Sequence, residues 1–320
     1  MASSASSTKP FAAEQTFKAY TLEQGIEYSQ GRTGYHKNLY QLIVDHHTST
    51  GGQLDTVIDV GCGPGIAARG IAPHFAHVIG LDPSEGMIAT ARSLGGVSSS
   101  LEPIRFEVST AEGLGSNLTP PIPDGSVDLI TAATAAHWFD MSGFWPRAAQ
   151  VLKRGGTVAV WTTSAMYIHP STPNHAAIQK VLDEYRERDL KPFRQEGNRL
   201  ARDLYLDLPL PWTLEQPVPE FDESKFFRKE WKRDNADEAN PFGLGPRTSN
   251  LDAVEKRLGT GSPVTRWREA HPDAVGTERD VVRVLRRNIE RLLHEAGVEE
   301  GKEIVTGGVE SVLLTIKKKA

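Results

Sequence analysis

The chain has 320 residues, 38% of them hydrophobic and 24% charged, a balance typical of a packed globular enzyme and unlike that of disordered or fibrous chains. The formal net charge of -5 provides no overall cationic field, so the composition argues against nucleic acid as a partner. A single cysteine, Cys62, excludes an internal disulfide, and no apolar stretch reaches the length that a membrane span needs.

The N-terminal stretch is rich in serine and carries the pattern of neither a secretory signal nor a transit peptide. We therefore expect residues 1–20 to be disordered and the protein to be cytoplasmic. Its expected partner is a small molecule, with no nucleic acid and no membrane involved, and the pattern leaves the oligomeric state open.

From residue 56 to residue 161, short β-branched runs alternate with stretches rich in helix formers. Strands are expected at 56–60, 77–81, 104–108, 126–132 and 157–161. Because strands joined by helices pair in parallel and are covered on both faces, this order predicts an α/β fold with a mostly parallel sheet.

After Trp161 a series of prolines breaks the alternation, which predicts an insertion that caps the sheet. Helices are expected at 174–190, 250–258 and 277–296, and late strands at 226–231 and 309–316. The domain prediction is a core over 21–165, a cap or substrate region over 166–300 that includes the strand near 226–231, and a final core strand within 301–320. The late strands bring the expected sheet to seven.

The first strand ends directly in a glycine-rich turn, Gly61 to Gly65, and the second strand stops at Asp82. Such a turn brings backbone N–H groups and the positive end of a helix close to a bound ligand. The dinucleotide fingerprint needs glycine or alanine where Ile66 stands, so NAD is disfavoured. The alternative is a purely structural turn, with Asp82 serving as a helix cap.

The spacing Asp59-x-Gly61-x-Gly63-x-Gly65 resembles motif I of class I S-adenosylmethionine-dependent methyltransferases, which have a Rossmann-like fold. The resemblance implies S-adenosylmethionine as cofactor, with the loop against its methionine part and Asp82 on the ribose hydroxyls. Other positions that it implies at the cofactor are Met87 against the adenine, Thr110, Ala111 and Glu112 at the adenine edge, and Ala132 at the end of the fourth strand. Glu112 could equally be a solvated turn residue.

Two further segments are similar to the trans-aconitate methyltransferases of fungi: Ala136 to Asp140 after the fourth strand, and Glu27 to Tyr35 before the first. Thr33 stands where that family has proline. The resemblance places Tyr28 and Arg32 at the cofactor, and Tyr35, His137 and Trp138 at the substrate.

The expected reaction is methylation of a small molecule, most simply at a carboxylate oxygen of an acid such as trans-aconitate. A carboxyl group with a pKa near ~4 is already ionised at neutral pH, so the enzyme needs only to orient it. Arg32 could hold a carboxylate of the cofactor or of the substrate through its planar fork. A hydroxyl or amine acceptor would instead need His137 as base.

Two alternatives stay open. The chain could be a tailoring methyltransferase of secondary metabolism that acts on a larger oxygen, nitrogen or carbon nucleophile, or a cofactor-binding protein without transferase activity. We predict no metal requirement, because the histidines show no paired ligand spacing with carboxylates. Cys62 is expected to fill space in the loop.

Overall fold

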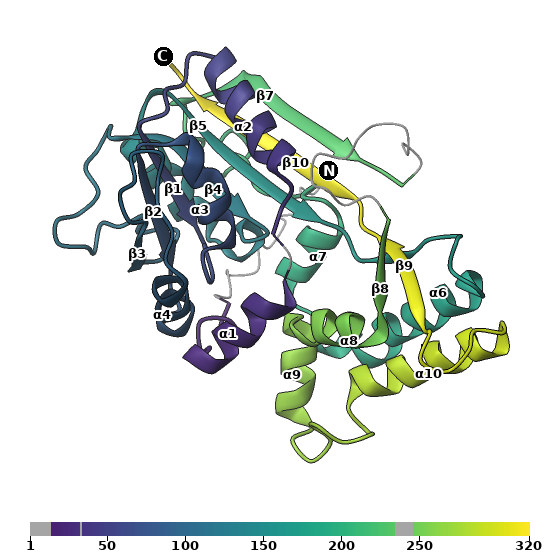
Figure 1. Ribbon diagram of the computed structural model, residues 1–320. Coiled ribbons are helices and arrows are strands. Elements are labelled where there is room, and N and C mark those ends of the chain that lie inside the picture. The colour runs from purple at the N-terminus through teal and green to yellow at the C-terminus, as the bar shows by residue number, and fades with distance from the viewer. Residues whose placement is uncertain (1–13, 33, 234–245) are drawn as a thin grey trace, which may run out of the picture.

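The computed structural model describes residues 14–32, 34–233 and 246–320, and a seven-stranded sheet forms its centre. The strands lie in the order β3 (Arg105–Val108), β2 (His77–Asp82), β1 (Thr56–Val60), β4 (Val127–Ala133), β5 (Leu152–Thr163), β10 (Ser311–Lys318) and β7 (Phe221–Trp231) (Figure 1). The first five pair in parallel, whereas β10 is antiparallel to both β5 and β7. The predicted mostly parallel seven-stranded sheet is confirmed.

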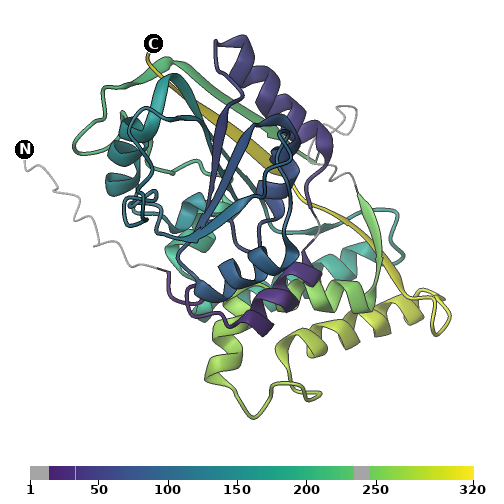
Figure 2. The same ribbon diagram turned by 60° about the vertical axis from the view of Figure 1, so that its left-hand side comes forward.

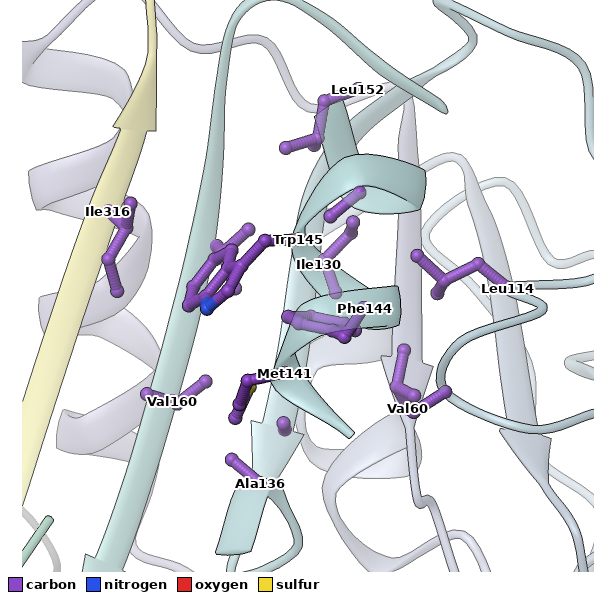
Figure 3. Packing of buried hydrophobic residues seen from close by; sticks show 14 of the residues in the cluster. Val60, Leu114, Ile130, Ala136, Met141, Phe144, Trp145, Leu152, Val160 and Ile316 are labelled. Carbon is purple, nitrogen blue, oxygen red and sulfur yellow. The ribbon is translucent and has the colours of Figure 1, made fainter. Parts of the chain in front are cut away.

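Helices cover both faces of this sheet. They are α2 (Lys37–Ser49), α3 (Ile66–Ile71), the short η1 (Ala72–His74), α4 (Glu85–Leu94), η2 (Ala136–Trp138) and α5 (Met141–Val151). Successive strand residues alternate between two cores, so Ile58 and Val60 pack on the α5 side and Val57 on the α2 side. Figure 3 shows Phe144 and Trp145 of α5 lying over Ile130 and Val160 of the sheet.

A second layer of helices lies at one end of the sheet, below it in Figure 1. It contains α6 (His175–Glu184), a π-helical turn (Tyr185–Asp189), η4 (Lys191–Phe193), α7 (Glu196–Arg202), α8 (Leu251–Gly259), α9 (Ser262–Ala270) and α10 (Val281–Glu295). The amphipathic α10 buries one apolar stripe in this layer, including Leu285 and Ile289. Within the described ranges no helix combines the length and the apolarity that crossing a membrane requires.

The cap also holds a small sheet that the sequence patterns do not predict. Its strands are β6 (Tyr167–Ile168), β9 (Ile304–Gly308) and β8 (Arg247–Asn250), in that order. Residues 304–308, expected to belong with the final core strand, therefore pair within the cap. Helix α9, which begins next to Pro263, is also not among the expected helices. In the structure this proline occupies the first turn of the helix, where its missing N–H group costs no hydrogen bond.

The segment before the first helix is ordered against the cap. Helix α1 (Leu22–Gly31) starts at a capping box formed by Thr21 and Gln24. Upstream, the Tyr20 hydroxyl lies 3.1 Å from Thr265 Oγ1, and Arg266 Nη1 donates to Thr16 Oγ1 at 2.9 Å. The prediction of disorder is thus wrong for residues 14–20, and residues 1–13 lie outside the described ranges. Figure 2 shows α1 lying alongside the cap helices.

Candidate active site

A cavity of about 590 Å³ lies where the carboxyl ends of the parallel strands meet the cap. Its walls come from three parts of the chain. The core contributes Gly61, Cys62, Gly63, Asp82, Met87, Thr110, Ala111, Glu112, Thr134 and Trp138; the N-terminal segment contributes Glu14, Phe17, Lys18, Tyr28, Arg32 and Tyr35; and the cap contributes Met166, Arg257, Leu258, Gly261 and Val309.

The glycine loop forms the floor of the cavity beneath β1. Gly61 and Gly63 have positive φ values of 63° and 53°, which glycine adopts without strain. A Cβ atom at Gly61 would stand 2.6 Å from the Cβ of Ala135, whereas at Gly63 it would meet nothing within 4 Å. Gly61 therefore permits close packing, and Gly63 leaves its space open to a ligand.

This difference predicts separate effects for two alanine substitutions. Gly61→Ala should lower the free energy of unfolding by about 1–3 kcal/mol or more, because it adds a clash to the backbone strain. Gly63→Ala should cost less stability, since only the backbone strain applies, yet it should weaken ligand binding in the cavity. Denaturant unfolding of both variants, with cofactor calorimetry on each, measures the two effects. Equal losses of stability would contradict this assignment.

Asp82 lies at the end of β2 and is 8% exposed. Its Oδ2 accepts a hydrogen bond from the Gly63 N–H group, and its Oδ1 accepts one from the Ser84 N–H group, both at 2.9 Å. Burial raises the pKa of this carboxyl group to about 6, against the lowering effect of these two hydrogen bonds. The side-chain cap of α4 is Ser84, whose hydroxyl accepts from Met87 N. Asp82 thus lines the cavity rather than capping the helix.

Three residues that the resemblance places at the cofactor lie behind the cavity wall. Asp59 is buried under the loop, where its Oδ1 accepts from Thr131 Oγ1 at 2.7 Å and burial raises its pKa to about 7. Gly65 faces the ring of Phe106. Ala132 points into the core beneath α5, because side chains alternate along β4, and Ala133 lines the cavity in its place. These three support the wall and do not form it.

Another wall of the cavity is formed by Met87 of α4 and by the loop after β3. Met87, Thr110, Ala111 and Glu112 all line the cavity, as the resemblance implies. Glu112 is more than a solvated turn residue, since its Oε1 accepts from the backbone N–H group of Asp140 at 2.8 Å. This bond joins the loop after β3 to the start of α5, so Glu112 also holds that edge of the cavity together.

Arg32 follows α1 and brings a guanidinium group into the cavity. The group lies over the Tyr28 ring, 5.0 Å from its centroid, and its Nη2 donates to Thr260 O at 3.5 Å. Its Nε is buried and has no hydrogen-bond partner among the described residues. The Arg32 side chain lines the cavity, and its positive charge suits an anionic ligand there.

The structure does not bring His137 to the cavity. The imidazole is buried, and its Nδ1 shares a hydrogen bond of 2.9 Å with the hydroxyl of Tyr205. Burial lowers its pKa to about 3. Because η2 turns successive side chains in different directions, His137 enters the core while Trp138 lines the cavity. The prediction of His137 as a catalytic or substrate-binding residue is therefore corrected.

The other predicted substrate residues do line the cavity. The Tyr35 hydroxyl lies 3.0 Å from Thr134 Oγ1, and burial raises its pKa to about 12. Trp138 makes an edge contact with Phe17, at 6.3 Å between ring centroids. Burial also raises the pKa of the Cys62 thiol, as expected of a residue that fills space.

Sequence reasoning misses the cavity residues that come from the N-terminal segment and the cap. Phe17 and Glu14 fall in a stretch expected to be disordered, and Arg257 falls in a helix whose cavity-facing side no local pattern reveals. The capping box at Thr21 was the available signal that order begins early.

One group of described residues has the spacing of a cation site, away from the cavity. Glu290 and His294, one turn apart on α10, place ligand atoms within 4.8 Å of Glu303. This corrects the expectation that no histidine is spaced to pair with a carboxylate. His294 Nε2 lies 2.7 Å from Glu303 Oε1, so a hydrogen bond accounts for the contact. The expected independence from metal stays a prediction.

Comparison with known proteins identifies this arrangement. The family model described as a methyltransferase domain matches residues 58–160, which contain the loop, Asp82 and the strands around them. Residues 58–160 are thus similar to a methyltransferase domain. A structure of a candidate type II methyltransferase from Anaeromyxobacter dehalogenans has a TM-score of 0.57 and 22% identity, over 90% of this chain and 97% of that one. The fold is the Rossmann-like fold of class I methyltransferases.

Relatives of the methyltransferase domain match a similar portion of the chain. A candidate methyltransferase of Dictyostelium discoideum is 35% identical over 141 residues, which are 44% of this chain and 48% of the relative. A candidate S-adenosylmethionine-dependent methyltransferase of Saccharomyces cerevisiae is 31% identical over 147 residues, 46% of each chain. The chain spans about half the length of these curated relatives.

Proposed function

We propose that this protein transfers a methyl group from S-adenosylmethionine to a small acid, at a carboxylate oxygen of a compound such as trans-aconitate. The observation that carries the proposal is a single cavity that unites the glycine loop, Asp82 and Arg32. The name of the yeast relative supports the choice of cofactor.

The residues of the cavity fit this cofactor. Asp82 has one backbone donor on each carboxylate oxygen, so each oxygen can still accept a hydroxyl proton of the ribose. Met87 supplies an apolar surface for the adenine, and the open space above Gly63 takes the methionine part. Arg32 offers the positive charge of its guanidinium group to a carboxylate. S-adenosylmethionine, when bound, supplies an electrophilic methyl group on its sulfonium.

The protein's own task is then to orient the acceptor and exclude water. The carboxylates that line the cavity already hold its walls: Glu112 accepts from Asp140 N, Asp140 Oδ1 caps α5 through Ser142 N, and Glu14 Oε2 accepts from Phe17 N. No histidine is among the described lining residues, because His137 is buried in the core. An acceptor that is already ionised at neutral pH suits such a site, which favours a carboxylate over a hydroxyl or an amine.

The test is incubation with methyl-labelled S-adenosylmethionine and a set of organic acids, followed by analysis of the product's linkage. A methyl ester releases the label in mild alkali, whereas an ether or an N-methyl group does not. A labelled product stable to alkali would favour the tailoring alternative. Cofactor binding without any product would favour the non-catalytic alternative. Activity should also survive a chelator, since the lining residues suggest no metal step.

The reaction's pH dependence should follow the same logic. With cofactor and acceptor saturating, we expect kcat to change little between about pH 6 and pH 8, because an ionised carboxylate needs no proton removed. Cofactor affinity should instead depend on pH through Asp82. A kcat that rises tenfold per pH unit in this range would contradict the carboxylate acceptor and favour a hydroxyl or amine.

A further inference from the structure

The cap brings a second arginine to the cavity, beside Arg32. Arg257 lies in the last turn of α8 and lines the cavity together with Leu258. The end of α8 contacts the end of α1, since Arg32 Nη2 donates to Thr260 O. Two arginines from distant parts of the chain thus line one cavity.

Arg257 has no ion pair with any described residue, and its Nη2 contacts the sulfur of Met166. Burial lowers its pKa, and the charged groups that add to this effect are Arg32 and Arg247, both of them cations. Other half-buried arginines of the cap differ in this respect. Arg266 lies 3.5 Å from Glu14, and Arg268 lies 2.8 Å from Asp280. Arg257 therefore faces the cavity without a counterion of its own.

The proposed cofactor does not supply a counterion for Arg257. S-adenosylmethionine carries one carboxylate, which the guanidinium group of Arg32 can bind, and two positive groups, its sulfonium and its amino group. A second guanidinium in the same cavity still needs an anion, because a partly desolvated cation without a partner is costly. The described carboxylates that line the cavity make no ion pair with Arg257, so we take the acceptor as the source of its anion.

We propose that Arg257 determines acceptor specificity by binding an anionic group of the acceptor other than the atom that is methylated. A carboxylate held in the fork of a guanidinium donates its electron pairs to that contact and is a poorer nucleophile, so the held group and the reacting group are different. The acceptor then carries at least one anionic group, carboxylate or phosphate, away from the reacting atom. This inference rests on the proposed methyl transfer but not on the identity of the accepting atom.

The binding test uses protein loaded with S-adenosylhomocysteine and three probes: succinate, its monoamide succinamate, and inorganic phosphate. We expect the wild-type protein to bind one of the two fully anionic probes more tightly than succinamate. Arg257→Gln should lower the affinity for the preferred anionic probe about tenfold to a hundredfold, and Arg257→Lys should restore part of that affinity. Preference for succinate or for phosphate identifies the anionic group.

Lys256→Gln is the matched control, because it removes one positive charge from the same helix at an exposed position. It should leave binding of the probes unchanged. In turnover with any accepted acid, Arg257→Gln should raise the KM of the acceptor and leave the dissociation constant of the cofactor as it is. Equal probe binding by wild type and Arg257→Gln, or no probe binding by wild type, would overturn the inference. Probe binding without methyl transfer would instead contradict the proposed function alone.

Discussion

Replacing Asp82 with alanine is expected to weaken S-adenosylmethionine binding about tenfold to a hundredfold, because a charge-assisted hydrogen bond contributes about 1.5–3 kcal/mol. The carboxylate is almost fully buried and already oriented by the N–H groups of Gly63 and Ser84. A ribose hydroxyl therefore meets an acceptor that needs no reorganisation. Isothermal titration calorimetry of both proteins gives the ratio of affinities.

The same carboxylate should make cofactor binding sensitive to pH. Its pKa in the cofactor-free protein is raised to about 6, so the ionised form is present above that pH and is lost as the pH falls through it. Affinity should consequently decline from pH 7 to pH 5 in the wild-type protein and much less in Asp82→Ala. Glu85→Gln, an exposed acid in the first turn of α4, is the matched control. Unchanged affinity in Asp82→Ala would remove Asp82 from the binding site.

Replacing Arg32 with alanine is expected to lower kcat/KM by about tenfold to a hundredfold or more, because it removes a charged, partly buried donor from the lining of the cavity. Arg32 also lies over the ring of Tyr28 and bonds to Thr260, so it joins the N-terminal segment to the cap. Steady-state kinetics with any accepted acid measures the loss.

Two further measurements separate the roles that Arg32 can have. If it holds the carboxylate of the cofactor, the dissociation constant of the cofactor should rise, and if it holds the acceptor, the KM of the acceptor should rise. Arg32→Lys keeps the charge and loses the planar fork, so it should recover only part of the activity. Arg188→Ala, an exposed arginine paired with Asp189, is the matched control. Full activity in Arg32→Ala would exclude both roles.

Lys317 is a buried cation that lies outside the candidate active site. Lys317 of β10 is buried against the end of α2, and burial lowers its pKa to about 8. Its Nζ donates to Thr157 Oγ1 at 3.2 Å and to the backbone oxygen of His47 at 3.4 Å. It does not line the cavity, so its titration belongs to the stability of the sheet.

The local pattern of the sequence determined the core and the cofactor side of the site. The β-branched runs and the turn after each of them predicted the five parallel strands, because burial of both faces requires such runs. The order of strand, glycine loop and acid predicted where Asp82, Gly61 and Gly63 lie, since the carboxyl ends of neighbouring parallel strands meet at one edge.

Only the tertiary structure decided which residues line the acceptor side of the cavity. One turn of η2 separates His137, which bonds to Tyr205 in the core, from Trp138, which lines the cavity, and no periodicity in three residues distinguishes them. The position of Arg257 at the cavity depends on contacts between distant segments. One of them is the bond from Arg32 to Thr260, which are 228 positions apart. Local propensity carries no information about such contacts, because their free energy comes from burial and charge in the assembled fold.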